Sequence, residues 1–316
     1  MNSFIQEDGM GNIFNEEGGQ FVEMKMEVDE VNYPLDNVTN FDQYNDEELE
    51  FCKLCLSSTV SFVSPKIDSM LKSLLPEHLY LEAKMASEAQ KVSLVCPPEI
   101  ATLAKKIVEG LTPFENDRDT GNCVMYLDKA KYEELDKTST NYQLLCITEK
   151  VIRAIDVLKK SGKVRESFWV RKFIEVVEVL LTDTDFVVSD GESVCNDTRA
   201  ASSGSVFGRR VDLLVSVSEG GTAINLASFE AKKGDAVVSS QLYQQIKNHR
   251  INAAILNRAN CLLGTTDHSC IYMDIVGSSG YFMQLSRKDD YLICQPLVNF
   301  RMATNLIEID YKQFFN

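Results

Sequence analysis

The 316-residue chain has three His residues, and no apolar stretch approaches the roughly 20 residues that a membrane-spanning helix requires. The three His residues are dispersed and form no cluster of metal ligands in the sequence. The motifs GxGxxG, GK(S/T), GxSxG and HExxH are also absent, which disfavours dinucleotide-binding, NTPase, serine-hydrolase and zinc-protease functions. An apolar content of 44% with 25% charged residues is typical of an ordinary soluble globular protein.

Basic residues are scarce at the N-terminus. Residues 1–50 contain 14 Asp and Glu but one base, Lys25, and few apolar residues. Such a segment cannot bury enough surface to offset its ordering entropy, so we expect a disordered acidic arm, either a solubilising tail or a segment that docks a protein partner. The remaining chain has 33 acids and 31 bases, so the net charge of -15 does not exclude a nucleic-acid partner.

The N-terminus also lacks the basic start and apolar block of a secretory signal. The nine Cys residues are an odd number, and several lie in apolar runs such as LLCIT and YLICQ, which predicts reduced and buried thiols. These features predict an intracellular protein of the cytoplasm or nucleus, with no membrane association.

Residues 51–162 predict a helical region that packs on the core. Apolar residues recur at i, i+3, i+4 and i+7 from 66 to 110, where Pro97 and Pro98 separate two helices, and again from 140 to 160. The stretch LTPFENDRDTGNC between them predicts a loop. No residue pattern in this region indicates site chemistry.

Residues 163–316 have a different pattern, in which helices and strands alternate. A helix at 166–182 precedes three strand-like runs, DFVVS, RRVDLLVSV and INLASFEAK; a polar helix and three more strand-like runs follow. The order α, β, β, β, α, β predicts an α/β domain with a mixed central sheet flanked by helices. The long polar segment 190–208 predicts a loop of the length that is often functional.

Three charged residues of this domain form the strongest chemical pattern. Asp212 lies among apolar neighbours in VDLLVSV, where an unpaired acid costs several kcal/mol. Glu230 and Lys232 are two residues apart in a predicted strand, so their side chains point to the same face. If the two strands are neighbours, two carboxylates and an ammonium converge on a site suited to Mg²⁺ or Mn²⁺. Such a cation activates water and polarises a phosphodiester, while Lys232 positions the water or stabilises the developing charge.

Asp212 on one apolar strand, followed by Glu230-Ala231-Lys232 on the next, resembles the D…(D/E)xK signature of the PD-(D/E)xK nuclease superfamily, which has the restriction-endonuclease-like fold. The resemblance covers about a third of the chain, roughly residues 165–275. Val211 stands where many members have a Pro that takes no part in the chemistry.

The resemblance implies roles for five residues. Asp212 and Glu230 would bind Mg²⁺ or Mn²⁺, and Lys232 would complete the catalytic set. Glu166 matches the acidic residue near the start of the first core helix, and Gln241 lies in the polar helix that contacts the site in the family. The function implied is metal-dependent hydrolysis of DNA or RNA, and a homodimer is compatible with the family.

Other interpretations remain open. The chain could be a catalytically inactive nuclease-fold module that binds nucleic acid or protein, or an interaction protein that works through its acidic arm and helical region. Glu230 and Lys232 could form an exposed cross-strand ion pair worth about 0 to 1 kcal/mol. Glu166 could be a helix-start acid favoured by the helix dipole, and Gln241 a surface residue.

Overall fold

The computed structural model describes residues 12–14, 21–23, 45–114, 120–162, 164–191, 193–200, 208–219, 222–266 and 268–309. Most of the predicted acidic arm lies outside these residues. Within its range, β1 (Asn12–Phe14) pairs with β2 (Phe21–Glu23), and α2 begins at Asp46, before the expected boundary at residue 50.

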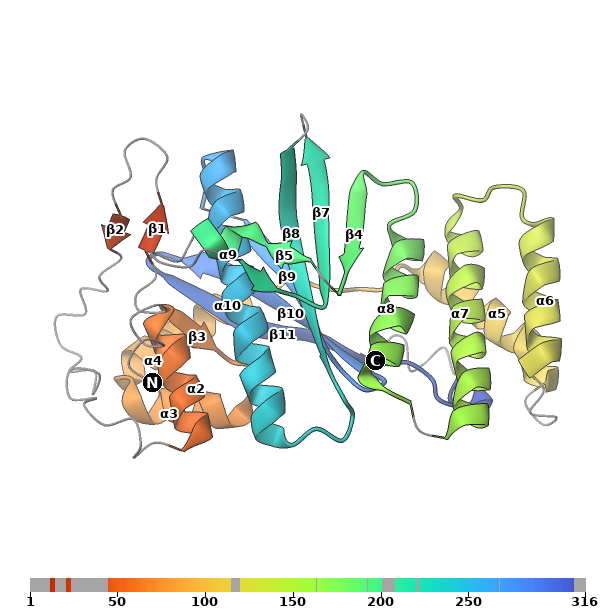
Figure 1. Cartoon of the computed structure of the whole chain (residues 1–316), viewed down its shortest axis with the longest axis horizontal. Coiled ribbons are helices and arrows are strands. Elements are labelled where there is room, and N and C mark those ends of the chain that lie inside the picture. The colour runs from red at the N-terminus through yellow and green to blue at the C-terminus, as the bar shows by residue number, and fades with distance from the viewer. Residues whose placement is uncertain are drawn as a thin grey trace.

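A seven-stranded mixed sheet forms the centre of the protein, in the order β3–β11–β10–β9–β8–β7–β4 (Figure 1). Only the pairs β8–β9 and β11–β3 are parallel, and the other neighbours in this sheet are antiparallel. The predicted α/β class with a mixed sheet flanked by helices is therefore confirmed. The strands are β3 (Thr59–Ser61), β4 (Phe186–Asp190), β7 (Leu213–Glu219), β8 (Thr222–Lys232), β9 (Ser269–Val276), β10 (Ser279–Lys288) and β11 (Tyr291–Arg301).

Helices cover both faces of this sheet. On one face α10, which connects the parallel strands β8 and β9, packs on β8 with α2 beside it; α8 lies on the other face with α7 next to it (Figure 1). The helices and 3₁₀ turns are α2 (Asp46–Leu56), α3 (Pro65–Leu74), α4 (Glu77–Gln90), α5 (Pro98–Leu111), η3 (Thr112–Phe114), α6 (Thr120–Glu133), α7 (Thr140–Ser161), α8 (Glu166–Leu180), α9 (Asn196–Ala200), α10 (Val238–Leu263) and η4 (Leu306–Glu308).

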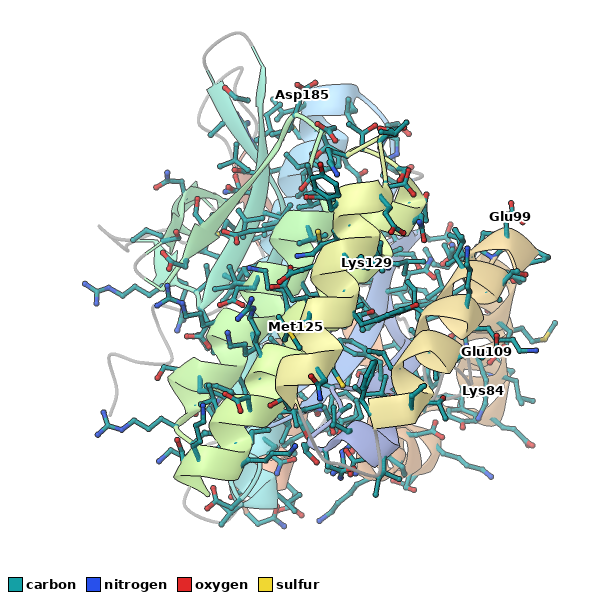
Figure 2. The ribbon with its side chains drawn as sticks, turned by 90° about the vertical axis from the view of Figure 1, so that its right-hand side faces the viewer. Lys84, Glu99, Glu109, Met125, Lys129 and Asp185 are labelled. Atoms are coloured by element: carbon teal, nitrogen blue, oxygen red, sulfur yellow. The ribbon has the colours of Figure 1, made fainter. Side chains whose placement is uncertain are left out.

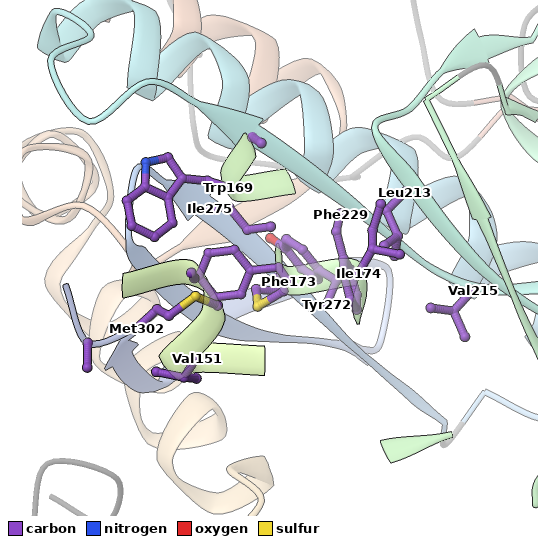
Figure 3. Close-up of a cluster of buried hydrophobic side chains, with 14 of the residues drawn as sticks. Val151, Trp169, Phe173, Ile174, Leu213, Val215, Phe229, Tyr272, Ile275 and Met302 are labelled. Carbon is purple, nitrogen blue, oxygen red and sulfur yellow. The ribbon is translucent and has the colours of Figure 1, made fainter. Parts of the chain in front are cut away.

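The largest hydrophobic core lies between the sheet and α8. Figure 3 shows Trp169 and Phe173 of α8 near Phe229 and Ile275 of the sheet. Each buried side chain of this size stabilises the fold by about 1.5 to 3 kcal/mol relative to an exposed one. A second, smaller core joins α10 to α2, α3 and α4, and its buried members are Phe51, Leu54, Ile67, Leu71, Tyr80, Leu242 and Ile246. Successive side chains of β8 therefore point to opposite faces of the sheet, one face covered by α8 and the other by α10. This alternation determines which side chains of β8 can form the site.

The predicted helices of the region 51–162 are largely present, but the region is not purely helical. Strand β3 lies within it and pairs with β11, so this region and the sheet domain share one sheet. The prediction of a loop over residues 111–123 is wrong at its end, because α6 begins at Thr120 and packs beside α7 (Figure 2). Burial of Cys123 and Leu127 stabilises a helix that its polar sequence did not predict.

The predicted loop 190–208 is only partly irregular. It contains β5 (Val194–Cys195) and α9, and β5 pairs with β6 (Arg209–Arg210), while residues 201–207 lie outside the described part.

All nine Cys residues are free, but only four are buried, and Cys261 is exposed. The prediction that the thiols are buried is therefore correct only in part. No helix of the described residues is long and apolar enough to cross a bilayer.

Candidate functional site

Asp212 and Glu230 come from neighbouring antiparallel strands. In the register of these strands Leu213 lies opposite Phe229, so Asp212, directly before β7, lies beside Glu230 near the end of β8. The backbone N–H of Ala231 donates a 2.8 Å hydrogen bond to Oδ2 of Asp212. The structure thus brings the two predicted carboxylates together. Asp212 is half-buried at a bend before the strand, whereas the sequence had indicated a place inside a buried strand.

Glu230 is the deeply buried acid of the pair, with 3% of its surface exposed. Its Oε1 lies 2.6 Å from Nζ of Lys247, on α10, and the same ammonium donates to the carbonyl oxygen of Arg210 at 3.2 Å. Burial raises the pKa of Glu230 to about 7, although Lys247 opposes this shift; the nearby Asp212 carboxylate adds to it. The alternative of an exposed Glu230–Lys232 ion pair is therefore wrong, because Glu230 is buried and pairs with Lys247.

Lys232 is the last residue of β8, and it is half-buried. Its positive charge acts to lower the pKa of Glu230, which places it within electrostatic range of that carboxylate. Among the described residues Lys232 forms no side-chain ion pair. Its carbonyl oxygen accepts a 2.8 Å hydrogen bond from the N–H of Gly277, which anchors the end of β8 to the turn after β9. The three predicted catalytic residues thus lie where β7 begins and the neighbouring strand β8 ends, and Lys247 of α10 contacts one of them, Glu230.

Sequence reasoning missed a second buried acid, Asp274. It lies directly opposite Glu230 in the parallel register of β8 and β9 and is 1% exposed. Burial raises the pKa of Asp274 well above its usual range, the Glu230 carboxylate adds to the rise, and a hydrogen bond from Asn248 opposes it. The signal was present in the sequence, because Asp274 stands in the apolar run CIYMDIV just as Asp212 stands in VDLLVSV.

A buried amide network holds α10 against these strands. Nδ2 of Asn248 donates to Oδ1 of Asp274 at 2.8 Å and to the carbonyl oxygen of Met273 at 3.1 Å, and its Oδ1 accepts from Oγ of Ser228 at 2.7 Å. Asn252, one turn later, accepts from the N–H of Ser228 and donates to its carbonyl oxygen. Since Ser228, Asn248 and Asn252 are all fully buried, the network fixes both the helix and the strand that carries Glu230.

The two supporting residues implied by the family resemblance lie apart from this network. Glu166 is the first residue of α8, and no hydrogen bond or ion pair joins it to Asp212, Glu230 or Lys232 within the described structure. Gln241 lies in the first turn of α10, where its side-chain NH₂ donates a 2.7 Å hydrogen bond to the carbonyl oxygen of Ala236. Gln241 therefore holds the loop before α10, and it is Lys247, further along the helix, that reaches Glu230.

A small pocket lies between α10, α3 and the sheet, next to Asp274. His249 lines it, and Nδ1 of His249 contacts the hydroxyl of Tyr272 at 3.1 Å while Nε2 has no hydrogen-bond partner among the described residues. Burial lowers the pKa of His249 to about 3, so the ring is neutral near pH 7. His249, Tyr272 and Asp274 lie between α10 and the sheet, on the same face of the sheet as Glu230.

The carboxylates fit a hard divalent cation. Mg²⁺ typically takes one or two protein carboxylates and completes its shell with water and phosphate oxygens, and Asp212 and Glu230 provide such a pair of hard oxygen donors. No group of three or more His, Cys, Asp or Glu side chains able to hold a metal occurs in the described part of the chain. A cation here would therefore depend on these two carboxylates and on oxygens from water or substrate.

No family model matches the chain, and no match was found among curated proteins or among solved structures.

Proposed function

We propose that the protein is a metal-dependent nuclease that hydrolyses phosphodiester bonds of nucleic acid with Mg²⁺ or Mn²⁺. The observation that carries this proposal is the pairing of Asp212 with Glu230 across neighbouring strands, with Lys232 two residues further along β8. In this function the two carboxylates hold the cation, which polarises the phosphodiester and activates water. Lys232 positions that water or stabilises the charge that develops on the phosphate.

The order of the elements supports the same function. Helix α8, strands β4, β7 and β8, helix α10 and strand β9 follow one another as α, β, β, β, α, β, apart from the short elements β5, α9 and β6. This order and the parallel β8–β9 pair agree with the restriction-endonuclease-like fold that we infer from the sequence.

Incubation of the full chain with panels of DNA and RNA in the presence of Mg²⁺ or Mn²⁺ tests the proposal. We expect cleavage by the wild type and a loss of about a hundredfold or more in Lys232→Ala and Asp212→Asn, because each removes a group that acts on the transition state. Lys233→Ala, which removes an exposed neighbouring lysine, is the matched control. Equal cleavage by the wild type and Lys232→Ala would show that the site is wrong.

A second candidate function is a nuclease-fold module that binds nucleic acid or protein without cleaving. The ion pair of Glu230 with Lys247 favours it, because a cation must compete with an ammonium that already contacts the buried carboxylate. Titration calorimetry with Mn²⁺ distinguishes the two functions. Nucleic-acid binding without Mn²⁺ binding supports the module, and saturable Mn²⁺ binding lost in Asp212→Asn supports the nuclease.

A further inference from the structure

Lys247 contacts the buried carboxylate of Glu230, one of the two carboxylates that would hold a divalent cation. Its Nζ contacts Oε1 of Glu230 at 2.6 Å and the Arg210 carbonyl oxygen at 3.2 Å, so the ammonium has two oxygen ligands close to the acidic pair. We propose that Lys247 is a built-in counter-ion that a divalent cation displaces from Glu230 when it binds. This inference rests on the proposed function, since it assigns a step of metal binding to the same site.

Burial makes the counter-ion necessary. The Glu230 side chain is 4% exposed, and Asp212 and Asp274 flank it on the two neighbouring strands. A carboxylate that is shielded from water and close to another acid stays ionised only if a positive charge contacts it. Lys247 supplies a charge that favours the ionised form of Glu230, and its contact orients the carboxylate before any cation arrives.

The mobility and charge of the lysine make exchange feasible. The Lys247 side chain is 27% exposed and ends a flexible four-carbon stem, so its ammonium has a path to solvent. An ammonium and a divalent cation repel each other and compete for the same oxygen, so both cannot stay on Oε1 of Glu230. Lys232, which forms no ion pair in the described structure, can remain in place, and the two lysines thus have separate roles.

Calorimetric titration of the full chain with Mn²⁺ at alkaline pH, where protons do not compete for Glu230, tests the exchange. We expect Lys247→Met to bind Mn²⁺ about ten- to a hundredfold more tightly than the wild type, because the competing charge is gone. Lys233→Met makes the same change in net charge at an exposed position and should leave the affinity unchanged. Equal or weaker binding by Lys247→Met overturns the inference and leaves the metal site standing. Absence of binding in all three proteins overturns both.

A measurement on the wild type guards against misfolding of the variant. Amine acylation followed by mass spectrometry should label Lys247 faster when Mn²⁺ is present than when it is absent, since the displaced ammonium turns toward solvent. Lys233 serves as the internal reference in the same sample. Labelling of Lys247 that stays constant or falls when Mn²⁺ binds overturns the inference, whatever the variant shows.

Discussion

Glu230 and Asp274 lie directly opposite each other on the parallel strands β8 and β9, and both carboxyl groups are buried. Two acids in this position cannot both be ionised at little cost, and the pKa of each is raised above its ordinary value. Lys247 contacts Glu230, whereas Asp274 receives a hydrogen bond from the neutral amide of Asn248. The two acids therefore differ in role: Glu230 contacts an ammonium that favours its charged form, whereas burial beside a neutral amide favours the neutral form of Asp274.

The raised pKa of Glu230 predicts a pH-dependent stability. Because the folded state holds a proton up to about pH 7 and the unfolded state releases it near pH 4.5, the free energy of unfolding falls as pH rises through this window. In Glu230→Gln the fall should be smaller by up to about 1.4 kcal/mol per pH unit. Urea unfolding at a series of pH values measures this, and exposed Glu178→Gln is the control. An identical slope in wild type and Glu230→Gln would contradict the assigned shift.

The amide network under α10 predicts a large cost for Asn248→Ala. The substitution leaves Oγ of Ser228 without its acceptor and Asp274 without its donor, in a place that water does not reach. Because each buried polar group left unpaired costs about 1 to 3 kcal/mol, we expect a loss of about 2 to 5 kcal/mol in the free energy of unfolding. Leu263→Ala, at the exposed end of the same helix, should cost much less. Similar losses in the two variants would show that the network adds little.

The close packing of the turn after β9 predicts that Gly277→Ala weakens both the stability of the fold and Mn²⁺ binding. Gly277 has φ +58°, and a Cβ there would lie 2.9 Å from Cα of Gly234 in the segment that follows Lys232. We expect a loss of about 1 to 3 kcal/mol in stability together with weaker Mn²⁺ binding, because the end of β8, which carries Glu230, must move. Gly264→Ala, which also has positive φ but open space around it, separates backbone strain from the clash. Equal effects of the two substitutions on Mn²⁺ affinity would exclude displacement of the end of β8.

The position of Gln241 predicts a modest effect of its removal. Its side chain donates to Ala236 in the loop before α10, so Gln241→Ala should lose about 0.5 to 1.5 kcal/mol of stability. Mn²⁺ affinity should stay unchanged, since no contact joins Gln241 to the acidic pair in the described structure. Calorimetry on wild type and variant checks this. A tenfold loss of Mn²⁺ affinity with unchanged stability would restore the site role that the family resemblance implies.

The sequence predicted the parts of the fold that have a strong local signal. Alternating apolar residues marked β7 and β8, and the period of two placed Glu230 and Lys232 on one face. It did not predict α6 or β3, because α6 starts with the weak helix formers Thr, Gly and Asn and β3 has only three residues. Both are stabilised by tertiary contacts, which a local pattern does not report.

The sequence predicted only the part of the site that lies on strands assumed to be neighbours in the sheet. The Asp212–Glu230 pairing could be predicted by assuming that the two consecutive strands are antiparallel neighbours, and this assumption is correct. The Glu230–Lys247 contact and the Glu230–Asp274 pairing both depend on how the 26-residue helix α10 returns the chain to the sheet. The spacing of these residues along the sequence does not reveal that either pair is close in space. The polar character of α10 was visible, but which of its side chains reaches Glu230 was not.

The parallel pairing of β3 with β11 determines how the chain can be shortened. A protein that begins at residue 163 would keep Asp212, Glu230, Lys232 and Lys247, but it would lack the strand that covers the edge of β11 and the helix α2 that packs against α10. Strand β3 pairs with Leu292, Ile293 and Cys294 near the start of the mostly apolar strand β11, and the edge exposed by its loss would pair with other molecules. The segment that carries these four residues is thus contiguous in sequence, yet its solubility as a separate fragment depends on residues more than a hundred positions earlier.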